Sequence, residues 1–138
     1  MHASATWHGG HRTVLNDGRG HEVVVDLPAH EGGEDLGTSS LELNVLSLAG
    51  CITTIFALVA QRRHLRVESM QLELEAERPR GAPTISSVHG SLRVRTAAPA
   101  DEVEATLGIT LRTCPVGILF EKAHIPVEVQ VVVERVPP

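Results

Sequence analysis

Two cysteines are the residues of this sequence that are best suited to chemistry. Cys51 and Cys114 are the only cysteines among the 138 residues, which is too few for the disulfide framework of a small secreted protein. Two thiols in such a chain are either inert groups of the core or a redox pair that forms and breaks one disulfide.

Cys51 falls within a long apolar segment. Ser39 followed by Glu42 is the pattern of a capping box, and the apolar run 41–60 predicts a helix that ends near His64. At about 100° per residue, one stripe of this helix holds small polar groups around the thiol. The members of that stripe are Asn44, Ser47, Cys51 and Thr54. Cys51 is either a reactive thiol in this stripe or a core cysteine that behaves as a small hydrophobe.

Cys114 stands directly before Pro115, where one expected helix ends and another begins. Residues 99–114 predict a helix with apolar residues at helical spacing, and residues 116–122 predict a short second one. If Pro115 begins the second helix, Cys114 lies at its N-terminal end, where the helix dipole and free N–H groups favour the thiolate. In the other interpretation Cys114 completes the apolar stripe of the preceding helix. The residues leave both interpretations open.

The remaining segments predict the strands that must position these helices. Alternation of apolar and polar residues, with Gly- and Asn-rich turns between the segments, is typical of half-buried strands. The expected strands are 3–7, 13–15, 21–26, 72–77, 85–96 and 127–134. Because strands and helices are grouped rather than strictly alternating, we expect one α+β domain over residues 1–138, with an antiparallel-rich sheet and the long helix on one face.

Composition and charge exclude several classes of partner. A net charge of -5, one Trp, two Phe and no Tyr provide neither the basic face nor the aromatic platform that nucleic acids need. The segment 41–60 is long enough to raise the question of a membrane span, but polar residues interrupt it, so we expect a buried helix in a soluble protein. Because no basic segment followed by an apolar segment comes after Met1, we expect no signal peptide. We therefore expect a cytoplasmic protein with no nucleic-acid partner and no membrane partner.

Metal and cofactor motifs are missing from the sequence. The chain has eight histidines, but neither HExxH nor CxxC occurs among its residues. The phosphate-binding patterns GxGxxG and GxxxxGK[ST] and the GxSxG elbow are also absent. We expect no metal and no bound cofactor.

Three short motifs together resemble those of a known family. They are GTSSLEL at 37–43, LAGC at 48–51 and TCPVG at 113–117. With the order of the expected elements, they resemble the OsmC/Ohr family over essentially the whole chain. The resemblance implies the OsmC-like fold, with antiparallel-rich sheets packed on a long buried central helix. It also implies an intertwined homodimer in which both chains contribute to each active site.

The resemblance further implies a thiol-dependent peroxidase that reduces small organic hydroperoxides in oxidative or osmotic stress defence. Cys51 would be the peroxidatic thiol and Cys114 the resolving thiol, and an external dithiol would restore the pair. The alternative is a non-catalytic OsmC-like dimer that binds a small apolar ligand or senses redox state.

The resemblance also suggests an Arg and a Glu as site residues. Arg12 is the better match for the family's N-terminal Arg and Arg19 is its rival; a cation is needed because burial raises the pKa of a thiol. Leu41 occupies the position of the family's Glu, ten residues before Cys51, and Glu42 stands nine residues before it. On a continuous helix Glu42 would face away from Cys51, so helix capping is the alternative to a catalytic role.

Overall fold

The structure, a computed structural model, describes residues 1–137. The chain forms two compact units, Met1–Asn44 and Val45–Pro138, and each unit contains one three-stranded sheet. The strands and α-helices follow one another as β-β-β-α-β-β-α-α-β, so the predicted α+β class is confirmed. The single domain expected over the whole chain stays a prediction.

The first unit is built around a small antiparallel sheet. Its strands are β1 (Ser4–Trp7), β2 (Thr13–Asn16) and β3 (Glu22–Val25), in that order across the sheet. A short 3-10 helix, η1 (Ala29–Glu31), follows in the Gly-rich loop. The three strands predicted before the long helix are therefore present, each within one or two residues of its expected bounds.

A buried carboxylate organises the loop that follows β3. Asp26 is 3% exposed, and it accepts hydrogen bonds from the backbone N–H groups of Leu27, Glu34 and Leu36. Burial by itself would raise the pKa of Asp26, but these N–H donors outweigh it and hold the pKa below its ordinary value. This one side chain therefore holds several backbone groups of the loop together, in addition to the bridge between Val25 and Thr38.

The long helix α1 (Ser40–Arg62) starts with the predicted capping box. The Glu42 N–H donates to Ser39 Oγ at 3.2 Å, and the Ser39 N–H donates to Glu42 Oε1 at 3.3 Å. The Ser39 hydroxyl also donates to Glu42 Oε1 at 2.7 Å. These bonds satisfy N–H groups that have no partner inside the helix, so local sequence explains where α1 begins.

The second unit contains the larger sheet, which joins one antiparallel and one parallel pair of strands. β4 (Ser69–Glu77) pairs antiparallel with β5 (Ser87–Thr96), and β5 pairs parallel with β6 (Val127–Arg135). A parallel pair needs a long crossover connection, and here α2 (Ala100–Thr113) and α3 (Pro115–Lys122) provide it. With two antiparallel pairs in the first sheet, the molecule is antiparallel-rich as predicted.

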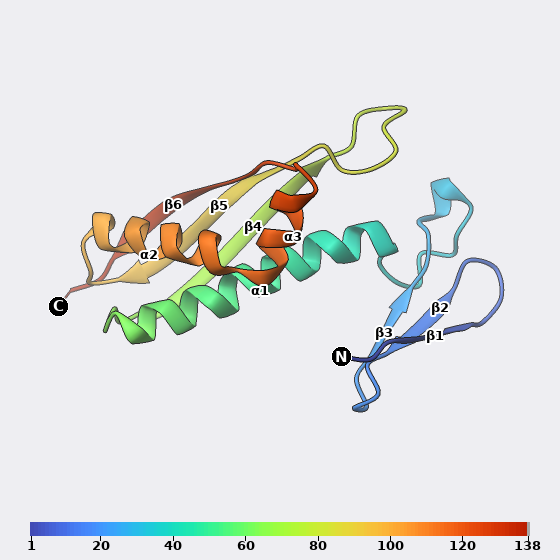
Figure 1. The fold of residues 1–138 in the computed structure, drawn as a ribbon, viewed down its shortest axis with the longest axis horizontal. Helices are drawn as coiled ribbons and strands as arrows, with labels where there is room; N and C mark the ends of the chain where they lie inside the picture. The colour runs from blue at the N-terminus through green and yellow to red at the C-terminus, as the bar shows by residue number, and fades with distance from the viewer. Residues whose placement is uncertain (138) are drawn as a thin grey trace. The chain divides into compact units, whose positions relative to one another are not determined.

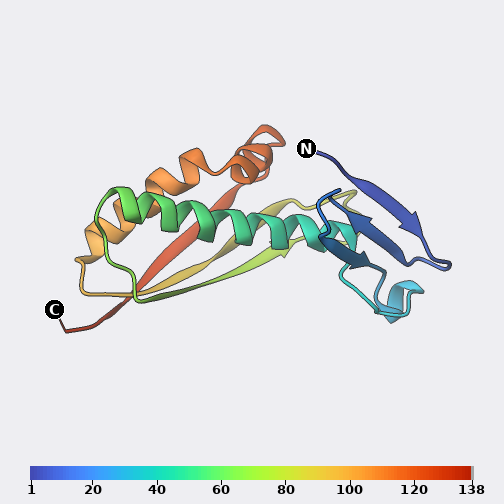
Figure 2. The same ribbon diagram turned by 90° about the horizontal axis from the view of Figure 1, so that it is seen from below.

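The helices cover one face of this larger sheet. Figures 1 and 2 show α2, α3 and the part of α1 that belongs to this unit on the same side of β4, β5 and β6. The core between them is aliphatic with two aromatic rings, those of Phe56 and Phe120. Its fully buried members include Leu48, Ile52, Phe56, Leu92 and Val94. The opposite face of the sheet carries the exposed polar residues of the alternating strands.

Helix α1 is buried on only one side within a single chain. The helix is long enough to span a membrane, and the mean hydropathy of its most apolar stretch of 18 residues is 2.1. Only 28% of that stretch is buried inside the chain. Leu46 is 56% exposed and Leu58 is 45% exposed. The long helix expected from the sequence is present, but one chain alone does not bury it.

Candidate active site

The two cysteines lie in contact in the second unit. Cys114 Sγ and Cys51 Sγ are 2.9 Å apart, with the Cys114 thiol as the donor, and both cysteines are free. A disulfide bond is about 2.05 Å long, so a small movement would join the two sulfur atoms. The structure thus brings together two residues that the sequence alone could not place side by side.

Helix α3 holds Cys114 in position. Cys114 is the N-cap residue of α3, Pro115 occupies the first helical turn, and the Gly117 N–H donates to Cys114 Sγ at 3.3 Å. Cys114 is also fully buried. Cys114 therefore lies at the start of α3, as the first interpretation expected, and is also buried at the end of α2, as the second expected.

The protonation of Cys114 differs from the expectation drawn from its position at a helix start. Burial, with a smaller contribution from the hydrogen bond to Cys51, raises the pKa of the Cys114 thiol to about 11. The Gly117 N–H acts in the opposite direction and is outweighed. Cys114 is therefore a neutral thiol near pH 7, and its S–H group can donate to Cys51.

Cys51 is the more accessible of the two thiols. It is half-buried, whereas its partner is fully buried. The other members of its stripe on α1, which are Asn44, Ser47 and Thr54, are exposed. A molecule that arrives from solvent can therefore reach Cys51 before it reaches Cys114.

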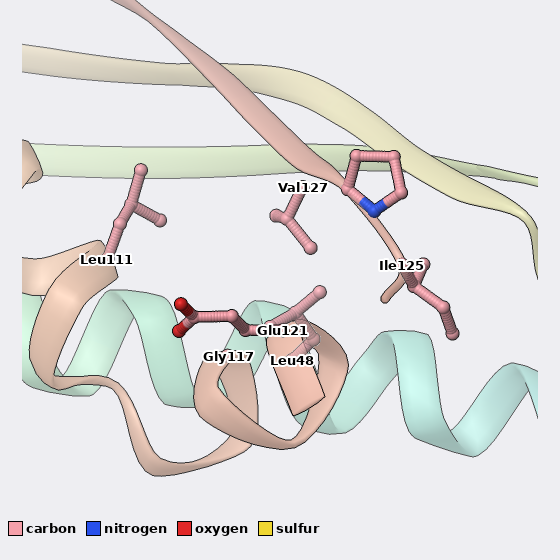
Figure 3. A pocket seen from close by; sticks show the side chains of 7 residues that line it. Leu48, Leu111, Gly117, Glu121, Ile125 and Val127 are labelled. Carbon is pink, nitrogen blue, oxygen red and sulfur yellow. The ribbon is translucent and has the colours of Figure 1, made fainter. Parts of the chain in front are cut away.

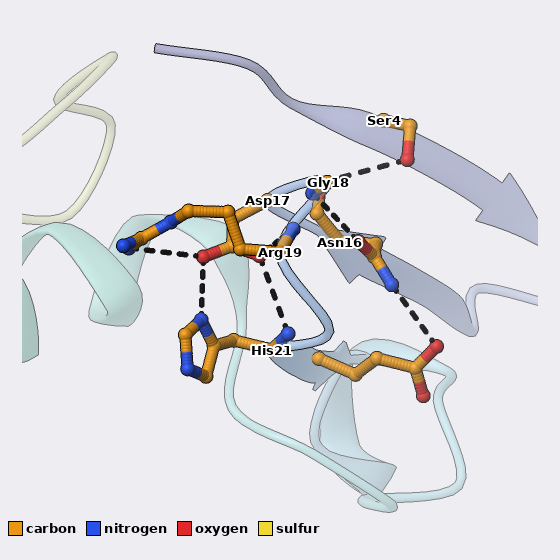
Figure 4. A network of polar contacts seen from close by, with 7 residues as sticks. Ser4, Asn16, Asp17, Gly18, Arg19 and His21 are labelled. Atoms are coloured by element: carbon orange, nitrogen blue, oxygen red, sulfur yellow. Dashed lines mark hydrogen bonds and ion pairs between the residues drawn. The ribbon is translucent and has the colours of Figure 1, made fainter.

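The two candidate arginines lie in different turns of the first unit. Arg12 sits in the turn before β2, where its backbone N–H donates to the Gly9 carbonyl. Arg19 forms an ion pair with Asp17 at 3.3 Å, and Asp17 also accepts from the His21 ring (Figure 4). This ring, and then the Arg19 backbone N–H, lower the pKa of Asp17. Arg19 therefore has a carboxylate partner, whereas no ion pair to Arg12 occurs among residues 1–137.

Glu42 has a structural role in the first turn of α1. Its carboxylate accepts the two hydrogen bonds from Ser39 described above. Both arginines and Glu42 belong to the unit Met1–Asn44, whereas the cysteines belong to Val45–Pro138.

A cavity beside the thiol pair was not predicted from the sequence. Its volume is about 220 Å³, and Leu48, Gly117 and Glu121 are among the residues that line it. Gly117 contacts Cys114, and Leu48 lies one helical turn before Cys51 on α1. Gly117 and Glu121 are four residues apart in the segment after Cys114 and Pro115. This spacing places both residues on one face of the short helix, and it was the only indication of the cavity that the sequence offered.

No candidate metal centre accompanies these residues. Within the described part of the chain, no group of three or more His, Cys, Asp or Glu side chains is placed to hold a metal ion.

The two sulfur atoms lie between a long apolar helix and a short helix that begins with Pro115, directly after Cys114. The helices cover a small sheet whose last strand, β6, pairs parallel with β5. These features together define a class of small α+β proteins with two neighbouring thiols. A family model described as OsmC-like protein matches residues 32–130. The chain belongs to this OsmC-like family, within the OsmC/Ohr group. A comparison with curated proteins found no match.

Solved structures share the fold at low sequence identity. An OsmC-like protein from Mycoplasma pneumoniae is 13% identical over 96% of this chain and 95% of its own, with a TM-score of 0.83. An organic hydroperoxide resistance protein OsmC from Legionella pneumophila is 20% identical over 95% and 96%, with a TM-score of 0.74. An organic hydroperoxide resistance protein from Elizabethkingia anophelis is 16% identical over 97% of both chains, with a TM-score of 0.76.

Proposed function

We propose that this protein is a thiol-dependent peroxidase that reduces small organic hydroperoxides in oxidative or osmotic stress defence. The observation that carries the proposal is the contact between Cys51 and the protonated Cys114 at 2.9 Å. Membership of the OsmC-like family supports it, as does the likeness to structures of proteins called organic hydroperoxide resistance proteins.

In the first step the Cys51 thiolate attacks the terminal oxygen of the hydroperoxide. The O–O bond breaks as the S–O bond forms, which leaves a sulfenic acid on Cys51 and an alkoxide that takes a proton to become the alcohol. Sulfur is oxidised and the peroxide is reduced by two electrons. The S–H group of Cys114 favours this step because its hydrogen bond stabilises negative charge on Cys51 Sγ.

In the second step Cys114 resolves the sulfenic acid. Its sulfur attacks the Cys51 sulfur, the S–O bond breaks, and the hydroxyl leaves as water with the proton of the Cys114 thiol. An external dithiol then reduces the disulfide by thiol–disulfide exchange and is itself oxidised. The short distance between the two sulfur atoms supports rapid resolution.

Arg12 is the proposed cation of the site. A positive charge near a thiol favours the reactive thiolate, and Arg19 is already paired with Asp17. Glu42 is proposed to act through the start of α1 rather than on the substrate, because its carboxylate is engaged by Ser39.

A homodimer is the proposed assembly. The uncovered side of α1 includes Leu46 and Leu58, and a second chain would remove this apolar surface from water. An intertwined dimer would also let both chains contribute to each site. We propose that the protein works in the cytoplasm without a membrane or nucleic-acid partner, because a covered α1 needs no bilayer.

Stoichiometric oxidation tests the proposal. The reduced protein is mixed with one equivalent of cumene hydroperoxide, and the products are identified by mass spectrometry. We expect a Cys51–Cys114 disulfide and one equivalent of alcohol, and Cys114→Ser should stop at a Cys51 sulfenic acid or a more oxidised form. Oxidation of Cys114 first would reverse the roles. If both thiols survive, the protein is better described as a non-catalytic dimer that binds a small apolar ligand.

A further inference from the structure

The two thiols have the geometry of a chelating pair. Cys51 Sγ and Cys114 Sγ are 2.9 Å apart, and both cysteines are free. Two sulfur atoms that separate helices hold this close together can bind one and the same atom, because little of their freedom remains to be lost on binding. Thiolate sulfur is a soft ligand and prefers soft acceptors. The surroundings of the pair restrict which acceptor fits.

The surroundings supply no third ligand. Within the described residues, no group of three or more His, Cys, Asp or Glu side chains is placed to hold a metal ion, whereas protein zinc sites use at least three protein ligands. Burial also raises the pKa of the Cys114 thiol to about 11, so a cation would have to release a firmly held proton to solvent. A suitable acceptor therefore needs only two protein ligands and carries a group that takes the thiol protons.

A monosubstituted trivalent arsenical meets both requirements. Its arsenic atom is soft and three-coordinate, and it already carries one carbon substituent, so two sulfur atoms complete its shell. In water the other two positions hold hydroxyl groups, which leave with the two thiol protons as two molecules of water. Two As–O bonds break and two As–S bonds form. Arsenic stays trivalent and both sulfur atoms stay reduced, so the reaction needs neither an oxidant nor a reductant.

Cys51 gives such a molecule access to the pair. The Cys51 thiol is half-buried, and a Cβ added at the neighbouring Gly50 would meet no atom within 4 Å. Ser47 and Thr54, on the same stripe of α1, are exposed. The organic substituent can therefore stay on this open side of α1 while arsenic bonds first to Cys51 and then to Cys114.

An internal cavity gives the sulfur atoms room to move apart. An atom bound to both sulfur atoms needs a somewhat wider gap than the present one, and a closely packed core resists such a change. Leu48, one helical turn before Cys51, and Gly117, in the first turn of α3, line a cavity of about 220 Å³. Figure 3 shows this space between α1, α3 and the start of β6. Side chains near the pair can shift into it.

We propose that the reduced Cys51–Cys114 pair is a binding site for monosubstituted trivalent arsenicals, which bridge the two sulfur atoms of one chain. This site goes beyond the proposed function, since its formation requires no peroxide. A bridged pair has no free thiol, so the bound arsenical also blocks the oxidation of Cys51 by a hydroperoxide.

Phenylarsine oxide tests the site. The reduced protein is mixed with one equivalent per chain, the intact mass is measured, and the unfolded product is labelled with iodoacetamide. We expect one phenylarsenic group per chain and no free thiol. Dimercaptopropanol should release the group and an equal concentration of glutathione should not, because a bridging atom is released only when both sulfur atoms are replaced. An adduct that leaves one thiol free for labelling would overturn the inference.

Single substitutions separate bridging from attachment to one thiol. Cys51→Ser and Cys114→Ser each leave one sulfur atom, and we expect each to lower the affinity for phenylarsine oxide at least about a hundredfold, as is typical when two linked contacts become one. Cys51→Ser changes the half-buried position, so it decides the outcome if Cys114→Ser does not fold. Ser47→Ala is the matched control, because it changes an exposed group on the same stripe and keeps both thiols. Unchanged affinity in a folded serine variant would overturn the inference.

Two further reagents test the choice of acceptor and its independence from the peroxidase reaction. We expect excess Zn²⁺ not to displace the arsenical, because the pair offers too few ligands, and displacement would overturn the inference. If phenylarsine oxide bridges the pair while cumene hydroperoxide oxidises neither thiol, the peroxidase proposal fails and the arsenical site stands. If the hydroperoxide forms the disulfide but phenylarsine oxide holds only one thiol, the arsenical site fails and the peroxidase proposal stands.

Discussion

At the scale of single residues, the proton on Cys114 divides the roles of the two thiols. A thiol whose pKa is raised to about 11 stays protonated across the physiological range, so Cys114 can donate a hydrogen bond. Cys51 receives that hydrogen bond and is the more exposed sulfur. Burial thus distinguishes the two thiols in the direction that the proposed roles require.

This division predicts unequal alkylation. At about pH 8 we expect iodoacetamide to label Cys51 at least about tenfold faster than Cys114, because only the thiolate reacts and Cys114 is both protonated and buried. As the pH rises toward 11, labelling of Cys114 should increase steeply with its deprotonated fraction. Peptide mass spectrometry after brief labelling measures both rates.

A variant isolates the contribution of the sulfur–sulfur contact. Cys51→Ala removes the hydrogen bond that helps to raise the pKa of Cys114, so labelling of Cys114 should begin at a lower pH. Burial remains, and the pKa should stay above that of a free cysteine. Equal labelling of both thiols at about pH 8 in the unmodified protein would contradict the assignment.

At the scale of elements, the start of α1 decides whether Glu42 is a cap or a catalytic group. Glu42→Ala should destabilise the protein by about 1 kcal/mol because it breaks the capping box, and thermal unfolding measures the loss. Glu42→Gln should keep most of that stability, since glutamine also serves in a capping box.

The same pair of variants separates the two roles through the rate of Cys51 oxidation. If Glu42 acts as a cap, the Glu42→Gln variant should oxidise at the rate of the unmodified protein. A large loss of rate in Glu42→Gln, with stability retained, would show that the carboxylate itself is needed in the reaction.

At the scale of the whole molecule, the exposed side of α1 predicts self-association. Leu46→Glu and Leu58→Glu each place a charge on that side and should shift the protein from dimer to monomer at micromolar concentration, as measured by sedimentation. Val132→Glu is the control, because Val132 is 43% exposed on the outer side of β6. A stable monomer in the unmodified protein would rule out the dimer.

The features that the sequence determined by itself are those with local causes. The capping box at Ser39 and Glu42 determines where α1 starts, and period-two alternation determines β4 and β6. Pro115 separates α2 from α3 because it lacks an N–H group and suits a first helical turn. Each of these depends on neighbours within a few residues, so no knowledge of distant contacts was needed.

The features that only the tertiary structure decided depend on distant segments. The contact of Cys51 with Cys114 requires α1 and α3 to pack together, and the raised pKa of Cys114 follows from burial that no local pattern encodes. The cavity beside the thiol pair exists only because Leu48 and Val127, from distant segments, line the same space. Burial and electrostatic environment are sums over residues brought together by folding, and this is why sequence spacing predicts the elements but not the chemistry between them.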